Sequence, residues 1–322
     1  MSYRRFFNRS LLPFAILCIC ATTPFYTHAN APSQESSKKS PSSSLKLISG
    51  SVEHPILSQP FTELLEYLEV PYEKDNLDSL MQALKVRFDR GSREIWEIPN
   101  KEIKDKATVF SLLEKVGVLS EVHPKHAHYD YAVVLGATCV RMQKRLAHLD
   151  RLYKSGVRFD RIILLSSERP LNPEIESKEQ ILKAAENVPA LSYDGKGPLP
   201  TTEGEAFAFY LKHLSLDSEL KKIPCTQASA SMEEKAPNHL RPNTADSVWK
   251  WLKANPKPGS ALVISNQPYV GYQGQVLQNL LPESFLVDTV GEKATPDYET
   301  MTVLNALYRW FQTEYEVLKE RK

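Results

Sequence analysis

The sequence predicts an α/β fold: a doubly wound, mainly parallel, Rossmann-like sheet with an N-terminal helical appendage. Residues 131–135, 161–165, 261–264 and 285–287 are short runs made up, apart from Arg161, of apolar residues, and they are separated by amphipathic segments. Runs that are apolar on both faces are typical of parallel strands covered by helices on each side. Before residue 128 the apolar residues follow a helical period instead, which predicts helices without a sheet.

The composition indicates a globular protein and excludes some classes of function. Of the 322 residues, 42% are hydrophobic and 25% are charged, which is too apolar for a disordered chain. The 40 Lys and Arg residues and 39 Asp and Glu residues leave a net charge of +1. We therefore expect no nucleic-acid partner, because such partners require a basic surface.

The first 31 residues have the pattern of a secretory signal peptide. Three arginines precede an apolar run at residues 11–21, and Ala29-Asn30-Ala31 forms a small-x-small cleavage site. A membrane-spanning helix needs about twenty apolar residues, and this run is about half as long. We expect cleavage after Ala31, export to the periplasm or cell envelope, and no stable membrane span afterwards; an uncleaved anchor is the alternative.

Three further regions follow the signal peptide. Residues 32–50 are predicted to be a disordered linker, since their first part is rich in Ser, Pro and Lys. Residues 51–127 are predicted to be the helical appendage, with a short strand at 94–98 and a helix end at Gly117. Its three apolar stripes are Phe61, Leu64, Leu65, Leu68; Leu77, Leu80, Met81, Leu84; and Val109, Leu112, Leu113, Val116.

Residues 128–322 are predicted to be the Rossmann-like α/β domain. We expect helices at 141–154, 174–186, 203–214, 244–254, 270–281 and 298–320. Two cysteines remain after the signal peptide, Cys139 and Cys225, and their spacing does not say whether they pair.

Parallel sheets bind ligands at the carboxyl ends of their strands, near the point where the strand order reverses. Polar segments occur at four such places in this sequence. They give the candidate ligand-binding residues Gly136, Arg141, Ser166, Ser167, Arg241, Asn243, Thr244, Asn266, Gln267, Tyr269 and Gln273.

Two arginines in this set indicate an anionic ligand. Arg141 enters a helix whose first N–H groups are unpaired and can hold an anion, although an ordinary strand-to-helix turn at Gly136 is the alternative. Arg241 stands beside the positive end of another helix, where Asn243 or Thr244 can serve as the cap. An anion that bridges Arg241 and the helix N–H groups explains this placement. No GxGxxG motif follows Gly136, so a dinucleotide is not indicated.

The other candidates suit recognition more than proton transfer. Ser166 and Ser167 can bind a phosphate or carboxylate together with Arg169, or form a polar loop, and no GxSxG motif surrounds them. The amides of Asn266, Gln267 and Gln273 do not titrate, and Tyr269 offers a stacking face. We therefore expect the main role of this edge of the sheet to be ligand binding rather than proton transfer.

Glu203 is the candidate catalytic residue, as a general base. Because Glu203 and Glu205 fall in the first turn of a predicted helix, the helix dipole alone also explains them. His123, His126 and His128 lie close together just before the first predicted strand, where a solvated entry loop is expected, so no metal site is predicted. The sequence identifies no cofactor.

Taken in order, these elements resemble the YdcF/SanA/ElyC-type family, bacterial α/β proteins of unknown function. The similarity covers residues 129–289 and rests on Val133-Val-Leu-Gly136, Ile162-Ile-Leu-Leu-Ser166, Thr202-Glu203-Gly-Glu205-Ala206, Asn243-Thr-Ala-Asp-Ser-Val248 and Leu262-Val-Ile-Ser265. It implies a Rossmann-like fold and, as for some members, a cell-envelope role; one cytosolic relative is associated with S-adenosylmethionine. This chain has Pro268-Tyr269 and Gln273 where many relatives have Tyr-His and Arg.

These observations lead to one functional hypothesis and one alternative. The hypothesis is an exported α/β protein that binds a small anionic molecule at the carboxyl edge of its sheet, as a hydrolase or transferase in envelope glycan or lipid-carrier metabolism. The alternative is a non-catalytic envelope protein that acts through protein–protein contacts of the helical appendage, which an exposed apolar patch on that appendage would favour.

Overall fold

The computed structural model describes residues 46–91, 93–94, 97–99, 103, 105–237, 239–295 and 297–320. The predicted signal peptide and residues 32–45 of the predicted linker lie outside the described residues. Of the short strand expected at 94–98, the described residues 94, 97 and 98 are not in a strand. None of the helices in the described part combines the length and apolar character that crossing a bilayer requires.

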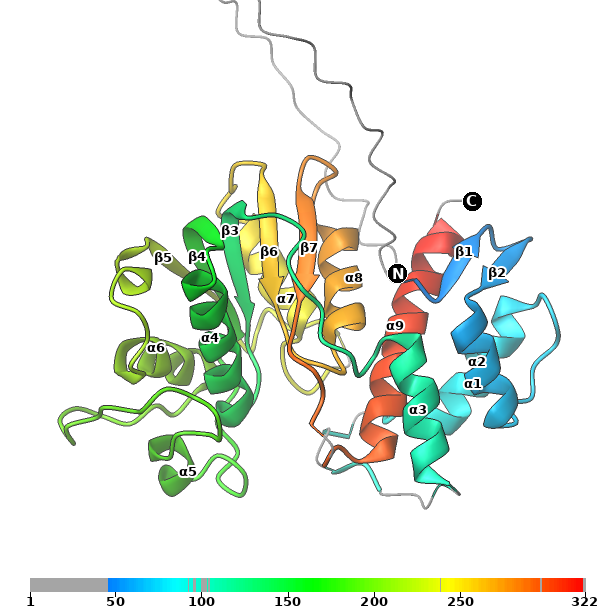
Figure 1. Ribbon diagram of the computed structural model, residues 1–322, viewed down its shortest axis with the longest axis horizontal. Coiled ribbons are helices and arrows are strands. Elements are labelled where there is room, and N and C mark those ends of the chain that lie inside the picture. The colour runs from blue at the N-terminus through cyan, green and yellow to red at the C-terminus, as the bar shows by residue number, and fades with distance from the viewer. Residues whose placement is uncertain are drawn as a thin grey trace, which may run out of the picture. The chain divides into compact units, whose positions relative to one another are not determined.

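The described residues form a five-stranded, all-parallel sheet, which confirms the predicted fold class (Figure 1). Its strands are β3 (His128–Leu135), β4 (Arg158–Ser167), β5 (Cys225–Ala230), β6 (Ser260–Ile264) and β7 (Leu286–Val290). The order across the sheet is β5-β4-β3-β6-β7. The chain therefore winds outward from β3 to β5, and then returns to place β6 on the other side of β3. The carboxyl ends of β3 and β6 flank the point where the order reverses, which is where open α/β sheets hold their ligands.

Helices cover both faces of this sheet. On one face lie α4 (Cys139–Lys154), α6 (Glu203–His213) and, packed on α4, the short α5 (Lys178–Leu182); on the other lie α7 (Thr244–Leu252) and α8 (Val270–Leu280). A 3₁₀ turn, Leu220–Lys222, precedes β5. Successive residues of β3 point to opposite faces of the sheet. Ala132 and Val134 pack in the core with α4 and α6, whereas Val133 and Leu135 pack in the core with α7 and α8. This alternation is the reason the strand reads as a continuous apolar run.

The helical region contains α1 (Gln59–Tyr67), α2 (Leu77–Phe88) and α3 (Lys106–Val116), preceded by a small hairpin of β1 (Ile48–Gly50) and β2 (Pro55–Leu57). The three predicted apolar stripes are turned inward, and Gly117 ends α3 at φ 92°, as expected. The end of the predicted linker is a correction: Leu47 and Ile48 are buried, because the chain is already paired and packed there.

The last helix, α9 (Thr300–Glu320), joins the two regions. We expected it in the α/β domain, but its apolar face fills the core of α1, α2 and α3, while it also packs along α8 (Figure 1). Trp310 of α9 lies so close to Gly271 of α8 that a Cβ there would overlap the indole ring. All described residues belong to one compact unit, residues 43–322.

Candidate functional site

A cavity of about 360 Å³ lies at the carboxyl edge of the sheet. Its floor is formed by the ends of β3 and β4 and the starts of α4, α6, α7 and α8. Its roof is formed by the segment after α2 and by α9 of the helical region. The cavity therefore occupies the reversal point of the strand order, closed from above by the helical region.

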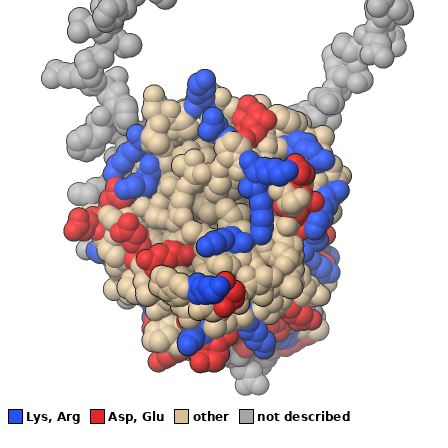
Figure 2. Space-filling view, turned by 90° about the vertical axis from the view of Figure 1, so that its left-hand side faces the viewer, with Lys and Arg blue, Asp and Glu red and all other residues tan. Residues whose placement is uncertain are grey.

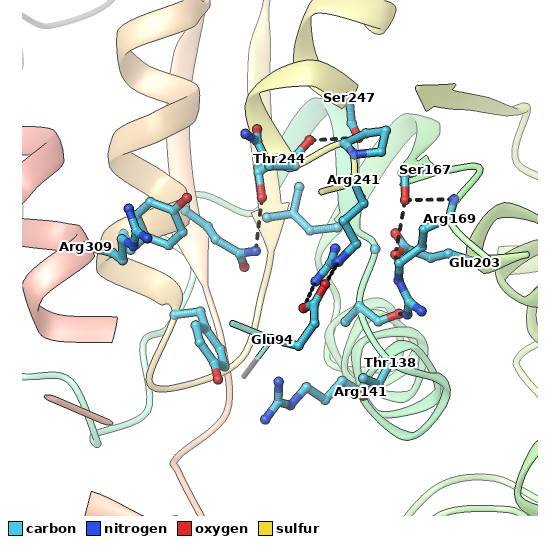
Figure 3. Close-up of a pocket in the computed structure, with 18 of the residues that line it drawn as sticks. Glu94, Thr138, Arg141, Ser167, Arg169, Glu203, Arg241, Thr244, Ser247 and Arg309 are labelled. Atoms are coloured by element: carbon cyan, nitrogen blue, oxygen red, sulfur yellow. Dashed lines mark hydrogen bonds and ion pairs between the residues drawn. The ribbon is translucent and has the colours of Figure 1, made fainter. Parts of the chain in front are cut away.

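Arginine is the residue that characterises this cavity (Figure 3). Among the described residues, seven arginines line it: Arg141, Arg145, Arg169 and Arg241 from the floor, and Arg90, Arg93 and Arg309 from the roof. Four carboxylates pair with them, namely Asp89, Glu94, Glu176 and Glu203. Three positive charges are thus in excess within the described residues. Figure 2 shows one face of the molecule, on which charged side chains of both signs surround a mostly uncharged centre.

Arg169 is the most strongly fixed of these cations. Its guanidinium lies 2.7 and 3.0 Å from the two carboxylate oxygens of Glu176, and its Nε lies 2.6 Å from Oε2 of Glu203. Burial lowers the pKa of Arg169, but the two glutamates outweigh it and raise that pKa above its ordinary value. The sequence left open whether Arg169 binds a ligand together with Ser166 and Ser167 or belongs to a polar loop. Its donors are instead occupied, so it holds the carboxylates in place.

Arg145 is buried without a carboxylate partner among the described residues. It donates to four neutral oxygens: the carbonyls of Leu135 and Gly136, and the side chains of Asn266 and Gln273. It thereby ties the end of β3 to the loop after β6. Burial and the nearby charge of Arg141 lower its pKa to about 10. A buried cation with only neutral partners favours an anion beside it.

Arg141, a predicted ligand residue, lies one helical turn before Arg145 on α4. Its guanidinium lies over the rings of Tyr269 and Tyr298, 5.0 and 5.7 Å from their centroids. No carboxylate within the described residues pairs with it. The N-cap residue Thr138, which also lines the cavity, makes no capping hydrogen bond. Arg141 therefore presents a charge without a carboxylate partner among the described residues, next to the start of α4; that it binds an anion stays a prediction.

Glu203 is the carboxylate at the centre of the floor. It is 5% exposed, and burial raises its pKa although Arg169 and Arg241 act in the opposite direction. Its Oε2 accepts from Arg169 and, at 3.4 Å, from Ser167. Its Oε1 packs against Gly136, where any Cβ would overlap it. Gly136 is thus required by the close approach of Glu203, rather than by a phosphate loop.

Arg241 lines the cavity but does not face a bare helix end. Its guanidinium forms a two-point contact with Glu94 of the roof, at 2.6 and 2.9 Å. The start of α7 is capped by its own residues, since Asn243 accepts from Ala245 and Asp246 while Asp246 accepts from Asn243. The expected anion bridge between Arg241 and these N–H groups is therefore replaced by a contact between floor and roof.

The structure brings most of the predicted residues together. Those that line the cavity are Gly136, Arg141, Ser167, Glu203, Arg241, Asn243, Thr244, Tyr269 and Gln273. Three do not line it. Ser166 bonds to Ser229, Asn266 accepts from Arg145, and Gln267 donates to the carbonyls of Gly117 and Ser120 and so fastens the helical region.

Sequence reasoning missed the roof. Arg90, Arg93, Asn305 and Arg309 belong to helices or loops far from any strand end, and nothing in their spacing marked them. Arg145 could have been found, because it lies four residues after Arg141 on the same helix face. His239, just before α7, was also missed.

The remaining sequence features have local explanations. Cys139 is buried and Cys225 is exposed, and neither forms a disulfide. Glu205 completes the capping box of α6 with Thr202. The three clustered histidines have separate neighbours: Glu121 for His123, Tyr129 for His126 and Asp160 for His128. His148 is buried in α4.

No family model, no curated protein and no solved structure matches this chain. The resemblance to the YdcF/SanA/ElyC-type family therefore depends on the sequence elements described above, and the geometry of the cavity carries the functional argument.

Proposed function

We propose that this protein binds a small phosphorylated molecule in the cavity at the carboxyl edge of its sheet. The observation that carries the proposal is the set of seven arginines against four paired carboxylates among the described residues. Arginine binds phosphate through several donors at once, and such charge-assisted hydrogen bonds are about twice as strong as neutral ones. Arg141 and Arg93, which have no carboxylate partner among the described residues, are the first contacts for the ligand.

We further propose that Glu203 makes the protein a hydrolase or transferase. A buried carboxylate with a raised pKa can take a proton from a water or hydroxyl group during its attack on phosphorus. The P–O bond to the leaving group then breaks, the arginines stabilise the charge on the phosphoryl oxygens, and solvent protonates the leaving oxygen. Arg169 and Ser167 orient Glu203 for this role.

The proposed place of this reaction rests on the sequence. The N-terminal pattern of residues 1–31 supports export, and the resemblance to the YdcF/SanA/ElyC-type family supports a cell-envelope role. We therefore propose a substrate from envelope glycan or lipid-carrier metabolism. The non-catalytic alternative needs an apolar patch on the helical region. Its main apolar stripes are instead buried against α9.

Calorimetric titration with inorganic phosphate and with a hexose 1-phosphate tests the proposal. Arg141→Ala should weaken binding more than tenfold, or about 1.4 kcal/mol. Arg158→Ala is the matched control: Arg158 also stacks on a tyrosine, 4.4 Å from the Tyr153 centroid, but at the opposite end of the sheet. Equal affinity of both variants and the wild type would refute the proposed site.

Hydrolysis is tested separately from binding. Release of inorganic phosphate from a panel of sugar phosphates should be lost in Glu203→Gln, while that variant still binds phosphate. Phosphate release at the wild-type rate in Glu203→Gln would remove Glu203 as the general base and leave the binding proposal intact.

A further inference from the structure

His239 lines the cavity and has no part in the function proposed above. Its ring nitrogen Nδ1 lies 2.8 Å from the side-chain nitrogen Nδ2 of Asn243, the N-cap of α7. The ring is therefore fixed by the residue that also closes the start of this helix.

The direction of this hydrogen bond follows from the backbone of α7. The side-chain oxygen of Asn243 accepts from the N–H groups of Ala245 and Asp246, at 2.7 and 3.3 Å. Only the oxygen of the amide can accept these bonds, so the NH₂ group is the side that faces His239. An NH₂ group donates, and Nδ1 of His239 must therefore accept and carry no proton.

We infer that His239 is held as the Nε2–H tautomer and donates a hydrogen bond from Nε2 to the anion in the cavity. In a neutral imidazole the proton absent from Nδ1 resides on Nε2. His239 is then a binding residue that offers a donor and no lone pair to the ligand. The identity of the ligand rests on the proposed function, whereas the tautomer rests on Asn243 alone.

This donor differs in kind from the arginines around it. The arginines attract any anion, whereas a neutral N–H adds no charge and requires an acceptor at one position. The phosphoryl oxygens of an inorganic phosphate or a phosphate monoester meet that requirement. Asn243 thus has two tasks, since it caps α7 and sets the proton of the adjacent histidine.

His213 of α6 supplies an internal control. Its Nδ1 lies 3.0 Å from the carbonyl oxygen of Ser192, which can only accept. The same reasoning therefore assigns the opposite tautomer, Nδ1–H, to His213.

Nitrogen NMR of the full chain labelled with ¹⁵N-histidine tests both assignments at a pH where the rings are neutral. The signals are identified by their loss in His239→Gln and His213→Gln. His239 should show the Nε2–H pattern and His213 the Nδ1–H pattern. Asn243→Asp keeps a good cap but turns an acceptor toward His239, and should move the proton to Nδ1. An Nδ1–H pattern for wild-type His239, or no change in Asn243→Asp, overturns the assignment.

Phosphate titration tests the contact with the ligand. His239→Ala should bind inorganic phosphate about five- to tenfold more weakly, as expected for one lost hydrogen bond, and His213→Ala should bind as the wild type does. Unchanged affinity in His239→Ala, together with a loss in Arg141→Ala, would refute the contact and leave the proposed function standing. Unchanged affinity in both variants would refute the proposed function as well, while the NMR result still decides the tautomer.

Discussion

The floor and the roof of the cavity use the same residue type in different ways. Floor arginines such as Arg169 and Arg145 are at most 3% exposed, and their donors are taken up by the protein. Arg309 of the roof is more accessible than these two: its side chain is 29% exposed and makes a single ion pair, with Asp89, among the described residues. Arg169 and Arg145 therefore hold the strand ends and Glu203 in place, while the roof arginines, like Arg141 of the floor, add charge that a ligand can reach.

The largest effect is expected on the floor. Arg169→Ala leaves Glu176 and Glu203 buried without their cation, which should lower the free energy of unfolding by about 3–5 kcal/mol. Urea unfolding followed by circular dichroism measures it. Arg309→Ala is the roof control and should cost about 1 kcal/mol or less, because its ion pair is partly exposed to solvent. Similar losses in the two variants would abolish the distinction between floor and roof.

The second prediction concerns buried carboxylates with different partners. Glu314 of α9 accepts from the backbone N–H groups of Leu47 and Ile48, but no cation pairs with it among the described residues. Burial raises its pKa from an ordinary 4.5 to about 7. The folded protein thus binds a proton between these values that the unfolded chain releases. Stability should fall by up to roughly 3 kcal/mol as the pH rises through this window.

Urea unfolding at pH 5, 6, 7 and 8 measures this slope, and Glu314→Gln should flatten it. For Glu176 of the floor the dependence of stability on pH has the opposite sign. Burial raises the pKa of Glu176, but the hydrogen bonds and charge of Arg169 outweigh burial and hold that pKa below 4.5. Its contribution is complete above pH 4.5 and is lost only as the pH falls further. A slope in Glu314→Gln equal to that of the wild type would show that another group titrates there.

The third prediction tests how closely the floor is packed. In Gly136→Ala the new methyl group would overlap Oε1 of Glu203 and lie 2.9 Å from the carbonyl oxygen of Leu165. Overpacking of this kind should cost about 1–3 kcal/mol of stability. A double-mutant cycle measures the coupling, because Glu203→Ala removes the larger of the two obstacles. Gly136→Ala should therefore cost less in the Glu203→Ala background, and strictly additive losses would contradict the contact.

The sequence was sufficient to predict the strands that consist of short runs of apolar residues. The strands β3, β4, β6 and β7 were predicted because residues apolar on both faces are rare outside a covered sheet. The strand β5 was missed because Cys225–Ala230 is mostly polar and lies at the edge, where only Ala228 and Ala230 are buried. The helix α9 was correctly predicted as a helix. Its partner was not, since an apolar stripe does not say which core it fills.

The same limit applies to the site. Residues after a strand or at a helix start could be predicted, because the topology of a parallel sheet brings those positions to one edge. That rule led to Arg141, Glu203 and Gln273. It also led to Gln267, which follows β6 but donates to the carbonyls of Gly117 and Ser120. No such rule predicts the residues of the roof, because Arg93 and Arg309 reach the cavity only through the packing of α9 on the helical region.

The smallest effect is expected for phosphate binding in a variant of the roof, and it tests the comparison between floor and roof most directly. Arg93 is exposed at the cavity and has no carboxylate partner among the described residues. Arg93→Ala should weaken phosphate binding about three- to fivefold at low salt, and the difference should shrink at about 0.5 M salt, because exposed charges are screened. The exposed Lys85, at the end of α2, gives the control variant Lys85→Ala, which should bind as the wild type does. A salt-independent loss in Arg93→Ala would mean that Arg93, like Arg169 and Arg145 of the floor, acts by fixing the structure rather than by attracting the ligand.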